Sequence, residues 1–177
     1  MAQDVRSIFV KFADRIDNLR TLQYHKDPEV AKRIADESLS IYAPIAARLG
    51  LYGFKEIMET LSLRELDLDG YLHVTGELAH YTLEQDKFLT QSVHKIRNLL
   101  PEKYRDTVTY RVKKPYSIYR KLKQSDVKSI RDIYDVFAIR IIVDDVSDCY
   151  AVLGLIHGHF TPISKRFKDF IAVPKSN

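Results

Sequence analysis

The stretch TVTYRVK (107–113) decides how the chain folds, because the residue spacing changes there from helical to strand-like. Every second residue from Val108 to Val112 is apolar, and this alternation is typical of a strand with one buried face. Arg111 and Lys113 therefore share the polar face of the expected strand. The change of period favours two modules that join near residue 100.

The first hundred residues have helical spacing. The pattern predicts an amphipathic helix from Val5 to Leu22. A second helix is expected from Pro28 to Leu49, with a kink at Pro44 because proline has no amide hydrogen to donate. A short third helix begins at Phe54, and Pro101 closes a further one. This part of the sequence predicts an α-helical bundle.

The residues after the strand begin with another helical pattern. It runs from Pro115 to Lys123, and proline is tolerated in a first helical turn. Ser117 and Lys121 are four residues apart and share one face of this helix. The run from Val136 to Val143 is apolar at odd and even positions, which predicts a central strand buried on both faces. Asp135 stands at the entrance of this strand.

The remaining pattern completes the fold class. A helix is expected around Cys149–Ile156, and a last strand at Phe170–Val173. Helices followed by an alternation of strands and helices indicate an α+β fold. We expect an N-terminal helical bundle followed by part of a mixed sheet with flanking helices.

The composition limits the function classes without choosing among them. The chain has 177 residues, of which 45% are hydrophobic, so it is long enough to form a core. A net charge of +4 is too small to indicate nucleic acid binding by itself. The single cysteine excludes an internal disulfide. Because neither a signal peptide nor an apolar run of about 18 residues is present, we expect a soluble cytoplasmic protein.

The charged residues of the second half suit phosphate chemistry. Transfer of a phosphoryl group needs cations on the phosphates and a carboxylate that holds Mg²⁺. Residues of these kinds are Arg111, Lys113, Ser117, Lys121 and Asp135. Basic residues between Lys165 and Lys175 could serve a second nucleotide, whereas no GxxxxGK[ST] loop occurs. The alternative is that these charges are solvated surface residues, as most exposed charges are.

Three runs carry a resemblance to a known family. RVKKPYSIYRKL (111–122), IYDVFAIRIIV (133–143) and residues 148–177 resemble consecutive parts of the synthetase domain of the RelA/SpoT family. In that family, ATP donates its pyrophosphate to the ribose 3′-hydroxyl of GDP or GTP. The resemblance implies a nucleotidyltransferase-like sheet, with ATP and GDP or GTP as substrates.

The resemblance also implies roles for individual residues. Arg111 and Arg140 would sandwich adenine, and Asp135 would be the catalytic residue that binds Mg²⁺. The ATP phosphates would be held by Lys113, Ser117 and Lys121. The segment that serves the guanosine acceptor and the transferring phosphates would include Lys168, Lys175 and Asn177. The basic run RFKD (166–169) resembles the bifunctional members, which also hydrolyse the product.

The N-terminal helix resembles the end of the family's HD-type hydrolase domain. The run KFADRIDNLRT (11–21) is followed by residues 37–63, which resemble the central helical bundle of the family. Asp14 would be the final ligand of a Mn²⁺ ion, and Asn18 and Thr21 would contact the guanosine nucleotide. Asp14 and Asn18 are four residues apart and share a helix face.

These resemblances predict three segments, which are the end of the HD domain (1–27), a helical linker (28–103) and the first half of the synthetase domain (104–177). No His-Asp dipeptide completes the Mn²⁺ site, and the family's guanine-stacking Tyr and catalytic Glu would follow Asn177. We therefore expect ATP binding without turnover. The alternative is a non-catalytic module that binds guanosine nucleotides or regulates a complete enzyme. Regulation by ribosome or tRNA would act through regions absent here, and the oligomeric state stays open.

Overall fold

The structure is a computed structural model that describes residues 6–124 and 127–175. The chain divides into two compact units. The first is built on Met1–Leu83 and Lys113–Val136, and the second on Glu84–Val112 and Phe137–Asn177. Asn177, which the sequence assigns to the acceptor segment, lies outside the described residues.

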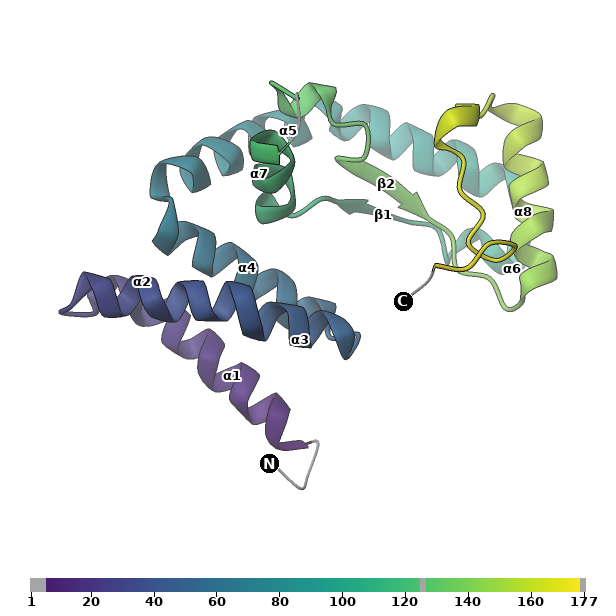
Figure 1. The fold of residues 1–177 in the computed structure, drawn as a ribbon. Helices are drawn as coiled ribbons and strands as arrows, with labels where there is room; N and C mark the ends of the chain where they lie inside the picture. The colour runs from purple at the N-terminus through teal and green to yellow at the C-terminus, as the bar shows by residue number, and fades with distance from the viewer. Residues whose placement is uncertain (1–5, 125–126, 176–177) are drawn as a thin grey trace. The chain divides into compact units, whose positions relative to one another are not determined.

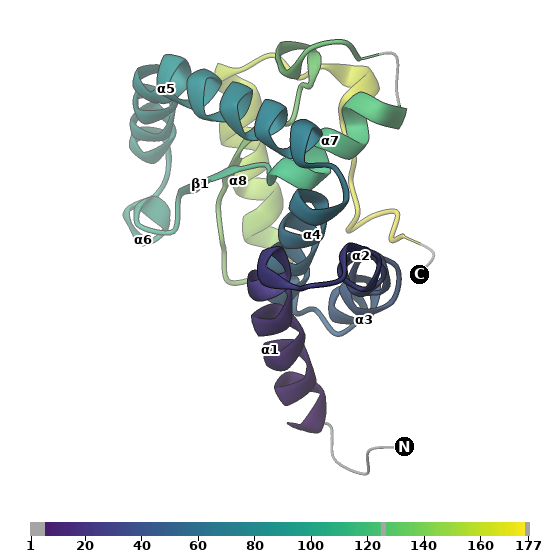
Figure 2. The ribbon, with the colours of Figure 1, turned by 90° about the vertical axis from the view of Figure 1, so that its left-hand side faces the viewer.

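The first unit is a helical bundle. Its helices α1 (Arg6–Thr21), α2 (Pro28–Glu37) and α3 (Ala43–Arg48) all pack on α4 (Tyr52–Leu66), as Figures 1 and 2 show from two directions. Apolar residues from all four helices meet in one core, and its most deeply buried members include Phe12, Leu19, Ala35, Ala46 and Met58. The predicted bundle is therefore confirmed, and burial of these side chains stabilises it.

Local signals in the sequence explain where α2 and α3 begin. The Asp27 carboxylate accepts hydrogen bonds from the amides of Glu29 and Val30, so it caps α2 directly before Pro28. The kink expected near Pro44 is a turn of π-helix at Ser38–Tyr42. Proline cannot donate a backbone hydrogen bond, and a wider turn immediately before it accommodates the loss.

Two further helices contribute to the first unit. The helix α5 (Leu68–Leu99) is far longer than its predicted C-terminal part, and it starts in the first unit and continues in the second. Its N-terminal half was not predicted from the apolar spacing, because large apolar residues such as Leu68, Leu72 and Leu83 are exposed instead of lining one buried face. The helix α7 (Pro115–Gln124) has the predicted limits within one residue, and Ile118 is its buried anchor.

The second unit contains the only sheet in the described part of the chain. Strands β1 (Thr109–Val112) and β2 (Phe137–Arg140) pair antiparallel, with Arg111 opposite Ala138. Helices α6 (Glu102–Arg105) and α8 (Val146–His159) belong to the same unit. Its core contains Val93, Leu100, Tyr104, Val108 and Val152. The predicted α+β class is confirmed.

Two strand predictions need correction. Strand β2 covers Phe137–Arg140 instead of residues 136–143, its alternate residues are exposed, and within the described residues it pairs only with β1. The predicted strand at Phe170–Val173 is a turn. The Asp169 carboxylate accepts hydrogen bonds from the amides of Ile171 and Ala172, and this local bonding replaces a strand ladder.

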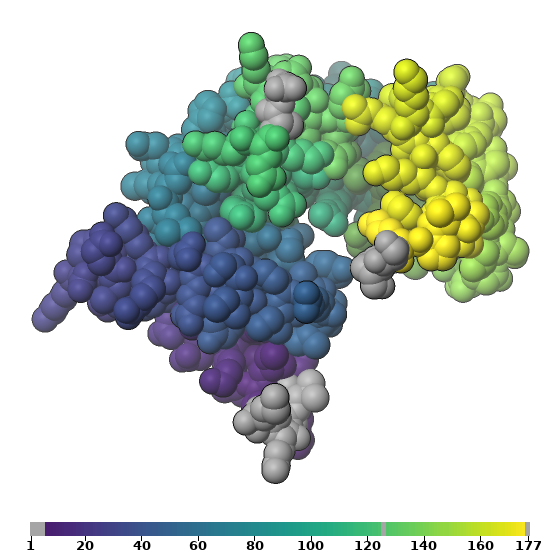
Figure 3. All heavy atoms as spheres, in the orientation of Figure 1, coloured from purple at the N-terminus to yellow at the C-terminus, as the bar shows by residue number. Residues whose placement is uncertain are grey.

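The segment after α8 folds back on this helix, as the space-filling view in Figure 3 shows for the yellow C-terminal residues. Tyr150 of α8 donates a hydrogen bond to Asp169 across 3.1 Å, and the rings of His157 and Phe167 lie edge to face. These two contacts hold the segment that carries Lys168 against α8.

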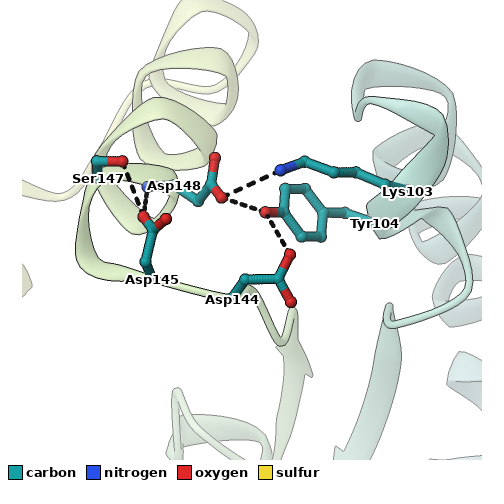
Figure 4. A network of polar contacts seen from close by, with 6 residues as sticks. All are labelled: Lys103, Tyr104, Asp144, Asp145, Ser147 and Asp148. Atoms are coloured by element: carbon teal, nitrogen blue, oxygen red, sulfur yellow. Dashed lines mark hydrogen bonds and ion pairs between the residues drawn. The ribbon is translucent and has the colours of Figure 1, made fainter.

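A polar network joins the start of α8 to α6 (Figure 4). The hydroxyl group of the buried Tyr104 donates to Asp148 and also lies 3.2 Å from the carboxylate of Asp144. Lys103 reaches the same Asp148 oxygen across 3.2 Å. The Asp145 carboxylate caps α8 by accepting from the Asp148 amide. The network therefore fixes the N-terminus of α8 in the second unit.

Among the described residues, none of the helices combines the length and the apolar character needed to span a membrane.

Candidate nucleotide-binding site

Two lysines of the first unit converge on one carboxylate. The Nζ atom of Lys113 lies 2.6 Å from Asp135 Oδ2, and the Nζ atom of Lys121 lies 2.7 Å from Asp135 Oδ1. The side chain of Asp135 is 55% exposed, whereas that of Lys113 is only 16% exposed. Three residues that the sequence assigned to one phosphate site are thus in direct contact.

The local fold explains this convergence. The amide of Lys113 donates to the carbonyl of Val136 across 2.7 Å, so Lys113 and Asp135 are held at neighbouring positions of two paired segments. Lys121 comes from α7, and Ser117 lies one helical turn before it on the same side of the helix. The predicted set of Lys113, Ser117, Lys121 and Asp135 therefore occupies a single region of the first unit.

The electrostatics of Asp135 follow from these neighbours. Partial burial acts to raise the pKa of its carboxyl, but hydrogen bonds from Lys113 and Lys121, together with their charges, lower that pKa to about 2. Asp135 is therefore ionised at neutral pH. Two positive charges and one negative charge lie within a few ångströms, which leaves an excess positive charge for an anion.

Asp135 is compatible with one kind of metal site. Mg²⁺ usually binds proteins through one or two carboxylates and completes its coordination with water and substrate phosphates. In residues 6–124 and 127–175, no group of three or more His, Cys, Asp and Glu side chains gathers as a metal cage. The donor set fits a Mg²⁺ ion that arrives with a phosphate-bearing ligand.

The two predicted adenine-binding arginines lie in the second unit. Thr109 is opposite Arg140, and Arg111 is opposite Ala138, so both arginines emerge on the same face of the two-stranded sheet. They are diagonal neighbours, whose separation is about 7–8 Å. A flat ring stacked between two planar groups needs about 3.5 Å on each side. This spacing suits an aromatic base between two guanidinium groups.

The predicted acceptor residues in the described segment are exposed. Lys168 follows the last 3-10 turn (Ser164–Arg166), and Lys175 lies 4.5 Å from the centre of the Phe170 ring. A cation over an aromatic ring is held only weakly at an exposed site. Lys175 can therefore leave the Phe170 ring for an anionic ligand.

The predicted hydrolase residues lie on the exposed face of α1. The side-chain amide of Asn18 donates to Asp14 across 3.3 Å, which confirms that these two residues share a helix face. The hydroxyl group of Thr21 is bonded to the carbonyls of Asp17 and Asn18 on its own helix. The opposite face of α1 is buried. Asp14 therefore offers a single carboxylate ligand within the part of the chain that the structure describes.

Sequence reasoning missed one polar contact beside the site. Tyr119 of α7 is half-buried, and its hydroxyl group donates to Asp67 across 2.7 Å. Asp67 and Tyr119 are 52 residues apart, so no spacing rule connects them. The available signal was that a Tyr in a patterned helix usually finds a hydrogen-bond partner for its hydroxyl group.

Comparison with protein families matches both ends of the chain. Residues 110–177 match the model described as a region found in RelA / SpoT proteins, and residues 1–52 match the model described as an HD domain. The first match contains Arg111 and Arg140 and the four residues of the predicted phosphate site, Lys113, Ser117, Lys121 and Asp135. The second contains Asp14, Asn18 and Thr21.

Comparison with curated proteins gives relatives over the whole chain. A guanosine-3′,5′-bis(diphosphate) 3′-pyrophosphohydrolase of Spiroplasma citri is 43% identical over 179 residues, and a GTP pyrophosphokinase of Myxococcus xanthus is 42% identical over 178. These alignments cover 100% of this chain but only 24% and 23% of the relatives. The two matches define a class of protein in which an HD domain is followed by a region found in RelA / SpoT proteins. The chain belongs to the RelA/SpoT family and spans about a quarter of the length of these relatives.

Proposed function

We propose that this chain binds ATP with Mg²⁺ as the donor in transfer of pyrophosphate to the 3′-hydroxyl of GDP or GTP. The observation that carries the proposal is the contact of Asp135 with both Lys113 and Lys121. Myxococcus xanthus and Brucella melitensis relatives named GTP pyrophosphokinase and GTP pyrophosphokinase rsh support the reaction class.

The lysines can change partners when the nucleotide binds. Triphosphate oxygens compete with Asp135 for Lys113 and Lys121, which both pair with this carboxylate in the free protein. As the lysines turn to phosphate, the oxygens of Asp135 become available as ligands. Asp135 would hold Mg²⁺, and the ion would offset the negative charge that develops on the phosphate oxygens during transfer. Ser117 adds a hydroxyl group that can donate to a phosphate oxygen.

Arg111 and Arg140 are the candidates for recognition of the base. Arg111 and Arg140 lie on one face of the sheet at a diagonal spacing suited to a planar ring. Guanidinium groups stack on aromatic faces, whereas ammonium groups do so less well. We propose that this pair binds adenine. Lys168 and Lys175 would bind phosphates of the guanosine acceptor.

The HD match supports a second activity in the complete protein. A relative named for 3′-pyrophosphohydrolase activity covers the whole chain at 43% identity. We propose that Asp14 supplies one ligand to Mn²⁺ in that hydrolase site and that Asn18 and Thr21 contact its nucleotide. A bifunctional, cytoplasmic protein regulated through ribosome or tRNA signals is the wider proposal that follows from the family.

The donor site can be tested by calorimetric titration of MgATP into the 177-residue chain. Lys121→Ala should weaken binding at least about tenfold, as expected when a charge-assisted contact to phosphate is lost. Arg120→Ala is the matched control, because it removes a cation from the neighbouring position of α7. Equal affinity in the wild type and Lys121→Ala would overturn the assignment.

A further inference from the structure

We infer that Tyr119 and Asp67 are positioning residues for the phosphate-binding face of α7. The inference rests on the proposed function, since it concerns how Ser117 and Lys121 are presented to the nucleotide. Neither Tyr119 nor Asp67 needs to touch the nucleotide. Both residues belong to the first unit, as do Lys121 and Asp135.

The Asp67 carboxylate has two separate partners. Its Oδ2 atom accepts the hydrogen bond from Tyr119, and its Oδ1 atom accepts the amide of Gly70 across 2.8 Å. Asp67 lies between α4 and α5, where its own amide donates to Leu63 and its carbonyl accepts from Tyr71. The same carboxylate therefore caps α5 and binds α7 through Tyr119.

The ring of Tyr119 packs closely against Gly70. A Cβ atom at Gly70 would lie 2.7 Å from Cε2 of Tyr119 and 2.5 Å from Oδ2 of Asp67, distances at which atoms overlap. The ring and the carboxylate thus approach the first turn of α5 as closely as a glycine allows. The position of Tyr119 is set by packing as well as by its hydrogen bond.

The position of Tyr119 on α7 explains why this anchor affects phosphate binding. Tyr119 follows Ser117 by two residues and precedes Lys121 by two, and two residues turn a helix by about 200°. Tyr119 is therefore on the side of α7 opposite to Ser117 and Lys121. Ile118, which lies between Ser117 and Tyr119 in the chain, is fully buried. An anchor on the back of the helix determines which way its front faces.

Two ion pairs support the same orientation. Lys123, one turn after Tyr119, lies 3.9 Å from Asp67 and 5.4 Å from the centre of the Tyr119 ring. Before the other end of α7, Lys114 lies 3.8 Å from Glu56 of α4. Both pairs are partly exposed, so each is individually weak. The Tyr119–Asp67 contact is the shorter and more buried restraint on rotation.

Loss of this restraint should affect ligand binding more than folding. The buried Ile118 still holds α7 in place when the hydroxyl group of Tyr119 is removed, but rotation of the helix is less restricted. Lys121 then spends less time directed at Asp135 and the phosphates. Small displacements of binding groups lower the affinity for the ligand, and supporting contacts are what hold such groups in their productive geometry.

The test is a double-mutant cycle on MgATP affinity in the 177-residue chain. Tyr119→Phe should weaken binding about threefold to tenfold, the range expected for residues coupled through one network. In the Lys121→Ala background, Tyr119→Phe should cause a clearly smaller loss, because Lys121 is already absent and only Ser117 is left to position. Tyr116→Phe, on the same helix, is the matched control and should bind like the wild type.

A second variant separates positioning from general destabilisation. Asp67→Asn keeps one of the two acceptor oxygens, which can serve Tyr119 while the Gly70 amide loses its partner, so it should retain more affinity than Asp67→Ala, which should lose as much as Tyr119→Phe. If Tyr119→Phe weakens MgATP binding equally in the wild type and in the Lys121→Ala background, the role of Tyr119 is merely structural and the inference is wrong.

The two proposals fail in different ways. If Lys121→Ala weakens MgATP binding but Tyr119→Phe leaves it unchanged, the positioning inference alone is overturned. If the wild type binds no MgATP or Lys121→Ala binds as tightly, the proposed donor site is overturned and the inference with it.

Discussion

Asp135 accepts a hydrogen bond from Lys121 across 2.7 Å, although 14 residues separate them in the chain. The same carboxylate holds Lys113 on its other oxygen. In the free protein, therefore, the proposed metal ligand is paired with both proposed phosphate-binding cations and offsets part of their charge. This arrangement makes metal and triphosphate binding depend on each other. It predicts that a substitution of Asp135 changes ATP affinity in opposite directions with and without Mg²⁺.

Asp135→Asn should change ATP affinity in opposite directions with and without Mg²⁺. Without metal, removing a negative charge beside the lysines should tighten ATP binding by about 1 kcal/mol, or roughly fivefold. With Mg²⁺, the lost metal ligand should make binding weaker than in the wild type. Titrations in EDTA and in excess Mg²⁺ measure both effects. Asp132→Asn is the matched control, and tighter binding of Asp135→Asn under both conditions would exclude Asp135 as a metal ligand.

The low pKa of Asp135 predicts a pH-dependent contribution to stability. Its folded pKa of about 2 is below its ordinary value of 3.8, so the ion pairs stabilise the fold above pH 3.8 and are lost as the pH falls toward 2. Because the carboxylate is half-exposed, solvent screening limits this contribution to about 1 kcal/mol or less. Urea unfolding of wild type and Asp135→Asn at pH 6 and at pH 3 should give a difference that shrinks in acid. A constant difference would contradict the ion-pair origin.

The arginine pair should discriminate ligands by their base. Arg111→Ala or Arg140→Ala should weaken ATP binding roughly twofold to fivefold, the range for exposed cation–aromatic contacts. Inorganic triphosphate, which has no base, should bind these variants as it binds the wild type. Arg140→Lys should behave like Arg140→Ala, because an ammonium group is not planar.

Competition titrations with both ligands check the arginine prediction. Lys165→Ala removes an exposed cation elsewhere in the second unit and serves as the control. An equal loss of ATP and triphosphate affinity in the arginine variants would mean that the arginines contact phosphates instead of adenine.

The Tyr104 network should stabilise the second unit. Tyr104→Phe removes the hydroxyl group that donates to Asp148 and leaves a partly buried carboxylate with fewer partners. The midpoint of thermal unfolding should fall by about 2–6 °C, as for loss of one buried hydrogen bond in a chain of this size. Tyr24→Phe, at a side chain that is 78% exposed, should leave the midpoint unchanged. Equal midpoints for the two variants would show that the network contributes nothing.

Gly70 and Gly76 of α5 offer a paired test of close packing. Alanine is favoured over glycine inside a helix by roughly 0.5–1 kcal/mol, so Gly76→Ala, where a Cβ atom meets nothing within 4 Å, should stabilise the chain. Gly70→Ala should instead destabilise it, because its Cβ atom would overlap Asp67 and Tyr119. Urea unfolding compares the two. Stabilisation by both variants would mean that Tyr119 can move away from α5 without cost.

Short-range patterns were enough to predict several of the local elements. The helix from Arg6 to Thr21, the irregular turn before Pro44 and the limits of α7 follow from helical spacing, proline chemistry and capping, which act within a few residues. The same spacing placed Ser117 with Lys121, and Asp14 with Asn18. Where spacing was ambiguous, as at Phe170–Val173, a side chain that bonded its neighbouring amides decided the outcome.

Tertiary structure alone decided which of these residues meet. The sequence determined that Lys113, Lys121 and Asp135 are of the right chemical types, and the resemblance grouped them, but strand pairing and the docking of α7 bring their side chains together. Register placed Arg111 and Arg140 on one face, and a shift by one residue would have separated them. Tyr119 and Asp67 meet across 52 residues because α7 packs beside the junction of α4 and α5, and contacts between distant residues leave no periodic signal in the chain.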